Sequence, residues 1–164
     1  MGIFQLTLIA ATLLCSLVAG FLFAFAAVVM PGIGNLGSGE FLRAFQVIDR
    51  VIQNNQPLFL LVWMGSVAAL LASAVLGFGQ LDGVGRLLLI GAVLVYLLGV
   101  QLPTVTINIP LNNTVQSLAI DGMDETAHEA ARRDFESRWN RWNSIRTVLA
   151  ILVSVLLIVL LIRL

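Results

Sequence analysis

Residues 3–30 read IFQLTLIAATLLCSLVAGFLFAFAAVVM, an apolar run that contains no charged side chain. The first charged residue of the chain is Glu40. A helix needs about 20 mostly apolar residues to cross the hydrocarbon core of a bilayer. Three later runs, at residues 51–81, 87–120 and 147–162, are also mostly apolar and contain no charged side chain. We therefore predict four membrane-spanning helices, at about residues 3–30, 58–79, 86–107 and 145–162.

The composition agrees with a membrane protein. Of the 164 residues, 59% are hydrophobic and 11% are charged, whereas soluble domains are typically about 45–50% apolar and about 25% charged. Nine basic and nine acidic side chains cancel, so the chain lacks the basic surface that nucleic-acid binding requires. The single Cys15 and the single His128 exclude an intrachain disulfide and a metal site built from several Cys or His residues.

Two segments between the spans are predicted to be helices rather than loops. Residues 39–54 place their apolar side chains on one helical face. Asp124 is a typical N-cap for a second helix, 124–144, which we expect to run on into the span at 145–162. The predicted fold is an all-α four-helix transmembrane bundle, one integral membrane domain over residues 1–164, with these amphipathic helices on one membrane face.

Small residues recur at every fourth position in two of the spans. Such stripes let helix backbones approach closely. They indicate packing within the chain, and a homodimer is the alternative. The stripes are Thr12, Ser16, Gly20 and Ala24 in the first span and Gly65, Ala69, Ser73 and Gly77 in the second.

The arginines indicate an orientation. Seven of the nine belong to the membrane face that carries segments 31–57 and 108–145, and only Arg86 and Arg163 lie toward the other face. Because arginine-rich segments favour the cytoplasmic side of a membrane, we expect segments 31–57 and 108–145 to be cytoplasmic.

Prolines and asparagines crowd the end of the third span. Pro103 and Pro110 each remove a helical hydrogen bond. We predict a distorted, amide-rich helix end here, which a membrane tolerates only against protein or a wet cavity. Asn108, Asn112 and Asn113 flank Pro110, and these amides either cap broken helix ends or line a site.

The start of the fourth span carries a second polar group. Trp139, Trp142, Asn143 and Arg146 follow at i, i+3, i+4 and i+7, so they share one helix face. An arginine at the start of an apolar run is costly unless it is paired. One interpretation is an interfacial anchor of tryptophans and a snorkelling arginine. The other is a pocket in which Arg146 and nearby amides bind the oxygens of an aromatic ligand.

These motifs resemble those of the anthrone oxygenase-like family of small four-span membrane proteins. The resemblance is carried by Asn108-Ile109-Pro110-Leu111-Asn112-Asn113 and Trp139-x-x-Trp142-Asn143-x-x-Arg146, with Gly20-x-x-Phe23, Pro31 and the helix around Phe41–Arg50 nearer the N-terminus. It implies oxidation of an anthrone to an anthraquinone by molecular oxygen, with no metal, flavin or other cofactor. The expected location is a bacterial inner membrane.

The candidate catalytic residues are Arg146, Asn112, Asn143 and His128, and the candidate substrate-binding residues are Asn108, Asn113, Trp139, Trp142, Tyr96 and Gln46. In the implied mechanism Arg146 and the asparagines stabilise an enolate oxygen, while His128 or Asp49 removes a proton. For His128 a plain surface position is the alternative. The expected partners are membrane lipid and a hydrophobic anthrone- or hydroquinone-like molecule. The competing function is a non-catalytic protein that binds a quinone or lipid, or an interaction subunit.

Overall fold

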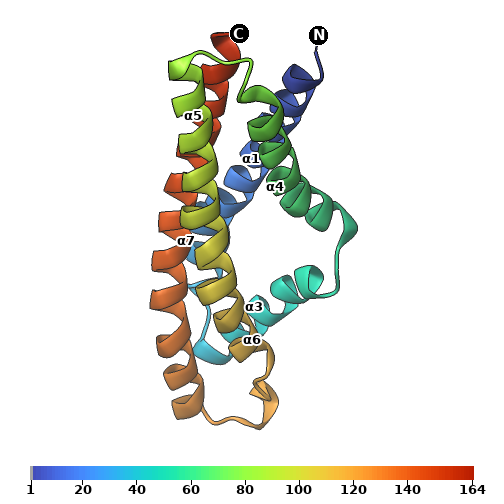
Figure 1. Cartoon of the computed structure of the whole chain (residues 1–164). Coiled ribbons are helices and arrows are strands. Elements are labelled where there is room, and N and C mark those ends of the chain that lie inside the picture. The colour runs from blue at the N-terminus through green and yellow to red at the C-terminus, as the bar shows by residue number, and fades with distance from the viewer. Residues whose placement is uncertain (1) are drawn as a thin grey trace.

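Four long helical rods form the bundle in the computed structural model, which describes residues 2–164 (Figure 1). The four rods are long and apolar enough to cross a membrane. They confirm the predicted all-α four-helix membrane fold. In chain order, the helices are α1 (Ile3–Ala24), η1 (Phe25–Val29), α2 (Met30–Ile33), α3 (Ser38–Gln53), α4 (Pro57–Gly77), α5 (Gly83–Leu94), η2 (Val95–Gln101), η3 (Thr104–Asn108), α6 (Ile109–Gln116), η4 (Ile120–Gly122) and α7 (Glu125–Ile162).

The prolines widen the third rod but do not end it. The rod runs without a break in direction through α5, η2, η3 and α6, and so passes the predicted end at residue 107 (Figure 1). Both η2 and η3 are π-helical turns, in which a carbonyl pairs with the N–H five residues on. Such a turn bypasses the N–H that Pro103 lacks. The distortion is therefore present, while the expected helix end is not.

The helix α7 is a single rod of 38 residues. It joins the segments predicted at 124–144 and 145–162, as expected from the sequence. Its N-terminus is capped by Asp124, whose carboxylate accepts a 2.8 Å hydrogen bond from the backbone N–H of Ala127. One helix thus carries the polar face around Trp139 and the apolar face of the last span.

The helix α3 lies across the end of the bundle that is remote from both termini (Figure 1). Its buried face contributes Phe41 and Phe45, whose rings lie 6.3 and 4.5 Å from the ring of Phe135 in α7. The Gln46 amide fixes the helix to the C-terminal end of α6 and the residues that follow it, because it donates to the carbonyls of Val115 at 2.7 Å and Leu118 at 3.1 Å. These contacts set α3 against both α6 and α7.

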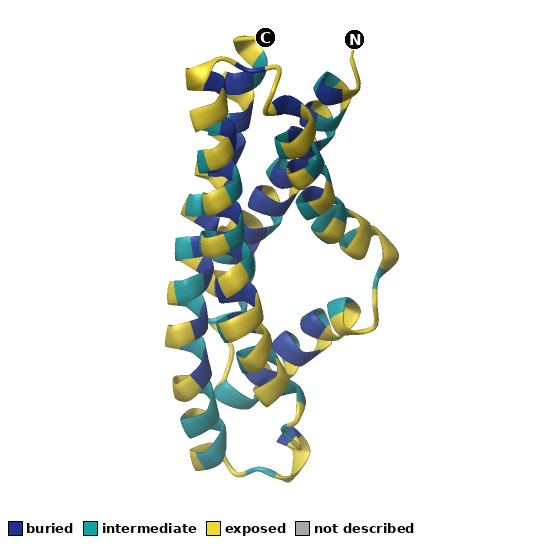
Figure 2. Cartoon of the chain, in the orientation of Figure 1, coloured by how far each residue is buried: buried dark blue, intermediate teal, exposed yellow. Residues whose placement is uncertain are grey.

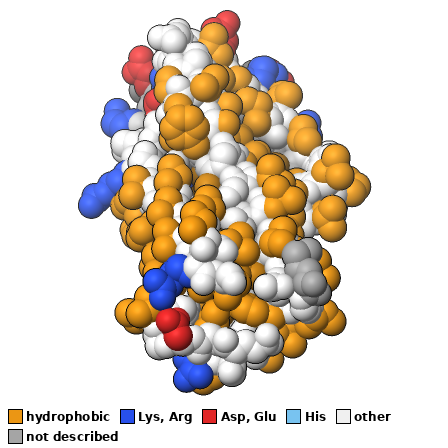
Figure 3. Space-filling model, turned by 90° about the horizontal axis from the view of Figure 1, so that it is seen from above, with side chains coloured by type: hydrophobic (Ala, Val, Ile, Leu, Met, Phe, Trp, Pro, Cys, Tyr) orange, Lys and Arg blue, Asp and Glu red, His pale blue; other side chains and the backbone are white. Residues whose placement is uncertain are grey.

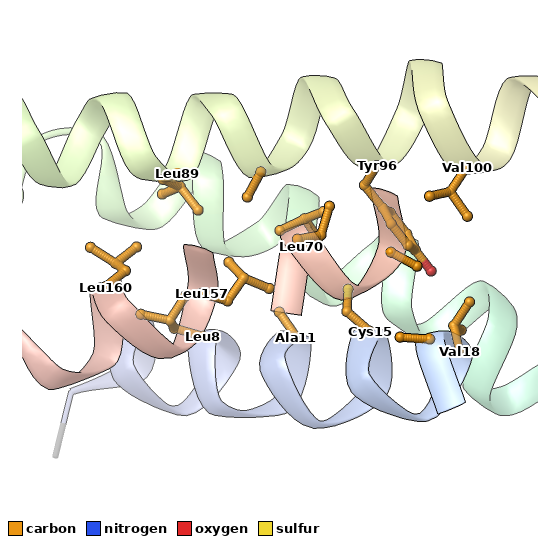
Figure 4. Close-up of a cluster of buried hydrophobic side chains, with 14 of the residues drawn as sticks. Leu8, Ala11, Cys15, Val18, Leu70, Leu89, Tyr96, Val100, Leu157 and Leu160 are labelled. Atoms are coloured by element: carbon orange, nitrogen blue, oxygen red, sulfur yellow. The ribbon is translucent and has the colours of Figure 1, made fainter. Parts of the chain in front are cut away.

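Buried residues face the interior of the bundle along its whole length (Figure 2). The apolar ones form two clusters. The larger cluster occupies the end with both termini, where leucine, alanine and valine side chains from α1, α4, α5 and α7 interdigitate around Tyr96 (Figure 4). Its close packing depends on glycine: a Cβ added at Gly77 would lie 2.3 Å from the ring of Phe4. The smaller cluster consists mainly of aromatic residues that join α3, α6 and α7.

The outer surface is largely apolar. Seen from the end that carries the termini, hydrophobic side chains cover most of the visible face, and charged side chains gather in a few places (Figure 3). Many leucines, valines and isoleucines on all four rods are exposed in the isolated chain. This surface fits a protein whose solvent is lipid.

Candidate functional site

A cavity of about 260 Å³ lies where the two apolar clusters meet. All four rods and α3 contribute to its wall, which is aromatic and aliphatic over most of its area. Its polar side chains are Asp49, Thr104, Asn108, Asn112, Asn143 and Arg146, and its aromatic side chains are Phe21, Phe25, Phe45, Phe59, Trp63 and Trp139. An apolar cavity with a few converging polar groups is the usual form of a small-molecule site.

The Arg146 guanidinium is enclosed by the bundle. Its residue is only 3% exposed. One terminal nitrogen, Nη1, donates to Thr104 Oγ1 at 2.8 Å, and the other, Nη2, donates to Asn143 Oδ1 at 3.0 Å. The Asn143 amide nitrogen in turn donates to the carbonyl of Leu22 in α1 at 3.1 Å. Three rods therefore hold this side chain in place.

Arg146 is not neutralised by a carboxylate. The ion pairs within residues 2–164 involve other arginines and His128, and Arg146 Nε has no hydrogen-bond partner there. A buried guanidinium with neutral partners retains an unbalanced positive charge. The cavity consequently offers a strong site for an oxygen that carries or develops negative charge.

Asn108 provides a second unsatisfied group. Its residue is 2% exposed, and both its amide nitrogen and its amide oxygen lack a partner within the described chain. A buried amide without hydrogen bonds costs about 1–3 kcal/mol. Because Asn108 lines the cavity, this cost is recovered when a ligand supplies the missing donor or acceptor.

Asp49 forms a separate polar group in the same cavity. This carboxylate, from α3, is 3% exposed. Its Oδ1 accepts from Asn112 at 2.7 Å, and its Oδ2 accepts from Gln53 and Gln116, each at 3.0 Å. The oxygen of the Asn112 amide accepts from the indole N–H of Trp139 at 2.7 Å. Trp139 and three amides thus orient the carboxylate, and no arginine pairs with it within the described residues.

The local sequence explains why these side chains converge. Thr104, Asn108 and Asn112 recur at every fourth position, so they form one stripe along the third rod. Trp139, Asn143 and Arg146 form the matching stripe on α7. The two rods run side by side (Figure 1), and the stripes face each other across the cavity. A π-helical turn, η3, spans the first half of the stripe on the third rod, from Thr104 to Asn108, and such turns are frequent at functional sites.

The structure brings together five of the ten candidate site residues. Asn108, Asn112, Trp139, Asn143 and Arg146 all line the cavity. Trp139 and Arg146 are 5% and 3% exposed, so they lie inside the bundle and not on its rim, where interfacial anchors would lie.

The other five candidates lie outside the cavity wall. Gln46 and Asn113 are structural contacts of α3: Gln46 binds backbone carbonyls, and Asn113 accepts from Gln53 at 3.0 Å on the surface. Tyr96 lies in the larger apolar cluster, where its hydroxyl and Ser66 Oγ are 2.6 Å apart. Trp142 is half-buried and does not line the cavity.

His128 also lies elsewhere. Its Nε2 is 3.0 Å from the carbonyl of Ile120, its Nδ1 is 3.5 Å from Glu125, and its ring packs on Gly39. Of the two candidate bases, only Asp49 faces the cavity. Among residues 2–164, no group of three His, Cys, Asp or Glu side chains is arranged to hold a metal ion.

Several cavity residues have no signal in the sequence. Thr104 follows Pro103 and binds Arg146, but a threonine in an apolar helix is ordinary. Phe21, Phe59 and Trp63 are hidden among the apolar residues of their spans. Only the packing of α1 and α4 against the other rods identifies them as part of the wall.

The chain also matches a known protein family. The model of the family described as anthrone oxygenase matches residues 51–156, which is more than half of the chain. The chain belongs to the anthrone oxygenase family. No curated protein and no solved structure matches the chain.

The family match contains both stripes of the cavity. Thr104, Asn108 and Asn112 of the third rod lie within residues 51–156, as do Asn143 and Arg146 of α7. The match begins after Asp49 and after the whole of α1. The part of the resemblance around Gly20, Phe23, Pro31 and Phe41–Arg50 therefore lies outside it. In this anthrone oxygenase family member, α1 and α3 complete a cavity whose polar stripes belong to the matched region.

Proposed function

We propose that this member of the anthrone oxygenase family is a membrane-embedded oxygenase. Its substrate is a hydrophobic aromatic molecule of anthrone or hydroquinone type, and its chemistry requires no bound cofactor. The observation that carries the proposal is that one apolar cavity contains a positive and a negative side chain that are not paired with each other. Arg146 and Asn108 offer unpaired hydrogen-bonding atoms, and Asp49 offers a carboxylate without a cation.

The proposed reaction begins with a proton transfer. Asp49 takes a proton from the methylene carbon opposite the carbonyl of an anthrone, and the electrons left behind spread onto the carbonyl oxygen as an enolate. Arg146, with Asn108, stabilises that oxygen in a cavity from which water is largely excluded. Asn112 and Trp139 hold the carboxylate in position for the transfer.

Molecular oxygen then reacts with the electron-rich carbon. The enolate passes one electron to oxygen, and the resulting pair combines to a carbon–oxygen bond. A proton from Asp49 completes a hydroperoxide on that carbon. Loss of the second hydrogen of the carbon and cleavage of the O–O bond release water and leave a new carbonyl. The balance is one methylene group and one O₂ converted to one carbonyl group and one H₂O.

The direct test is oxygen consumption by the purified protein in lipid nanodiscs with anthrone and with hydroquinones. The wild type is expected to consume one O₂ per anthrone oxidised, above the rate in empty nanodiscs. Arg146→Met removes the charge at similar length, and we expect it to lower the rate about 100-fold or more, the usual cost of losing an oxyanion donor. Asp49→Asn keeps the shape of the side chain, and we expect a comparable loss.

Matched controls are available on the surface. Arg138→Met and Asp134→Asn make the same substitutions at exposed positions of α7, and both variants are expected to retain the wild-type rate. Oxygen uptake that equals the lipid blank across anthrones and hydroquinones would contradict the proposal. Saturable binding without uptake would then favour the competing function, a quinone- or lipid-binding protein.

A further inference from the structure

A second hollow adjoins the cavity on the side of α3 and α4. It has a volume of about 620 Å³ and is lined by side chains of α1, α3 and α4. From the turn at Gln56, α3 and α4 diverge, and the hollow, which we call the α3–α4 groove, lies between them against α1 (Figure 1). Gln56 is its one polar lining residue, and the amide oxygen of Gln56 already accepts from the N–H of Phe59.

The groove and the cavity share one wall. Phe21, Phe25, Ile52, Phe59 and Trp63 line both. Four of these are aromatic and form a row: the ring of Phe21 lies 4.9 Å from that of Phe25 and 5.3 Å from that of Phe59, and Phe59 is stacked on Trp63 at 5.3 Å. A flat ring system in the cavity would therefore meet aromatic faces along this shared wall, and it would enter from the groove by displacing these side chains.

The apolar, exposed rim of the groove indicates that it faces lipid rather than water. Its outer lip is formed by Val47 and Val51 of α3 and by Leu58 at the start of α4, which are 61%, 56% and 68% exposed in the isolated chain. Because α4 is a membrane-spanning helix, apolar side chains at this position contact acyl chains. A lipid-dissolved molecule reaches the groove without crossing water.

An acyl chain alone would not satisfy what lies beyond the groove. Both polar atoms of Asn108 and the Nε of Arg146 lack partners, and a hydrocarbon supplies neither donor nor acceptor. A molecule with an oxygen-bearing head and an apolar remainder satisfies these atoms in the cavity and fills the groove with the rest. A cavity with unpaired polar atoms that shares a wall with a larger apolar groove thus favours an amphiphilic ligand.

We propose that the α3–α4 groove is the route by which the substrate leaves the bilayer for the cavity, and the subsite in which its apolar extension stays. The ligand class is a membrane-dissolved ring carbonyl compound or phenol, such as an anthrone, quinone or hydroquinone, that bears an apolar chain. This inference rests on the proposed function only for the identity of the head group. Because lipid and groove are equally apolar, the apolar chain of the ligand gains little affinity from leaving the bilayer. The groove therefore serves to give that chain room while the ring occupies the cavity.

The test compares methylbenzoquinone with decylbenzoquinone in nanodiscs, through quenching of tryptophan fluorescence. Of the three tryptophans, Trp63 and Trp139 line the cavity. Affinities are expressed per lipid so that partitioning cancels. In the wild type the two ligands are expected to bind within about twofold of each other. Val51→Phe fills part of the groove without adding a tryptophan, and it should weaken the decyl ligand about tenfold or more relative to the methyl ligand, because added volume in a filled site costs binding energy.

Val155→Phe is the matched control, since Val155 is an exposed valine of α7 that lines neither hollow. It should behave as the wild type. Equal weakening of both ligands by Val51→Phe, or none, would overturn the inference and leave the groove to lipid chains. Absence of saturable quenching by both ligands would overturn it as well. A decyl chain with a terminal photoreactive group gives an independent measurement: labelling of residues 47–63 supports the inference, and labelling confined to other helices contradicts it. Neither measurement uses oxygen uptake, so failure of the oxidation leaves the inference standing.

Discussion

The two halves of the bundle are built on opposite principles, although α7 runs through both. Toward its C-terminus α7 presents Ala150, Val153 and Leu157, which are fully buried in a closely packed apolar cluster (Figure 4). One and two turns before Ala150, the same face presents Arg146 and Asn143 to a cavity with unpaired polar atoms. The packed half gives the protein a rigid frame. The hollow half retains unsatisfied groups, which is the usual mark of a site where structure serves function.

Replacing Asn108 by leucine tests this contrast most strongly. If the unpaired amide serves a ligand, Asn108→Leu should slow substrate turnover. The activation free energy should rise by about 1.5–3 kcal/mol, the value of a hydrogen bond to a charged oxygen. The same variant should unfold at a higher temperature, because it removes a buried amide without partners. Turnover is measured by oxygen uptake and stability by thermal unfolding in detergent. A variant that is less stable and equally active would mean that Asn108 supports the packing of the bundle and does not bind a ligand.

The packed half should respond in the opposite way. A Cβ at Gly77 would collide with the Phe4 ring, so Gly77→Val should destabilise the protein by about 1–3 kcal/mol. Gly20→Val is the control, because a Cβ at Gly20 meets no atom within 4 Å. Activity per folded molecule should be unchanged in both variants, since neither glycine lines the cavity. Equal unfolding temperatures for the two variants would contradict the packing argument.

A smaller effect is expected where the two halves meet. Trp139→Phe keeps an aromatic ring but removes the indole N–H that donates to Asn112. One lost hydrogen bond corresponds to about 0.5–1.5 kcal/mol. Because Asn112 orients Asp49, the loss should appear mainly in the catalytic rate and less in the affinity for substrate. Oxygen uptake over a range of substrate concentrations separates the two, and a change in affinity alone would argue against a positioning role.

The smallest effect belongs to a surface pair at the packed end. The Asp82 carboxylate accepts from the N–H of Gly85 at 2.7 Å and lies 3.1 Å from Arg163. The Gly85 N–H above all, and then Arg163, hold the pKa of the Asp82 carboxyl below its ordinary value. Because this pKa is lowered in the folded state, the ionised Asp82 carboxylate stabilises the folded protein at pH values above its ordinary pKa. This stabilisation is lost as the pH falls through the lowered pKa.

The corresponding measurement is thermal unfolding of the wild type and of Asp82→Ala at several pH values. The difference between them should be constant above about pH 5 and should shrink in acid below about pH 4. Since both partners lie at the protein surface, high salt should also reduce the contribution of Arg163. A difference that stays constant in acid would mean that the ionised carboxylate contributes nothing.

The sequence predicted the helical architecture and part of the site. Charge-free runs of sufficient length require spanning helices in lipid, because each backbone polar group must be paired within its own segment. The asparagines around Pro110 and the face from Trp139 to Arg146 could be assigned to one end of the bundle from topology alone. The order of the spans therefore predicts that these two groups of site residues lie together.

The sequence could not fix which side chains of these faces enter the cavity. Successive residues of a helix are rotated by about 100°, so Asn113 points about 100° away from Asn112, and Trp142 lies at the edge of the face that Trp139 and Asn143 share. Shared spacing defines a broad face, whereas a cavity accepts only a narrow strip of it. Trp142 and Asn113 accordingly lie outside the cavity wall.

By itself, the sequence determined that this chain is a four-helix membrane protein of a recognisable family, because hydrophobic length and short motifs are local properties. Only the tertiary structure decided that Asp49 of α3, the Leu22 carbonyl of α1 and the aromatic row of α1 and α4 complete the cavity. Those contacts join residues far apart in the chain, and they depend on how each rod is rotated and offset against its neighbours. Packing sets that rotation and offset, and no periodicity within a single helix encodes it.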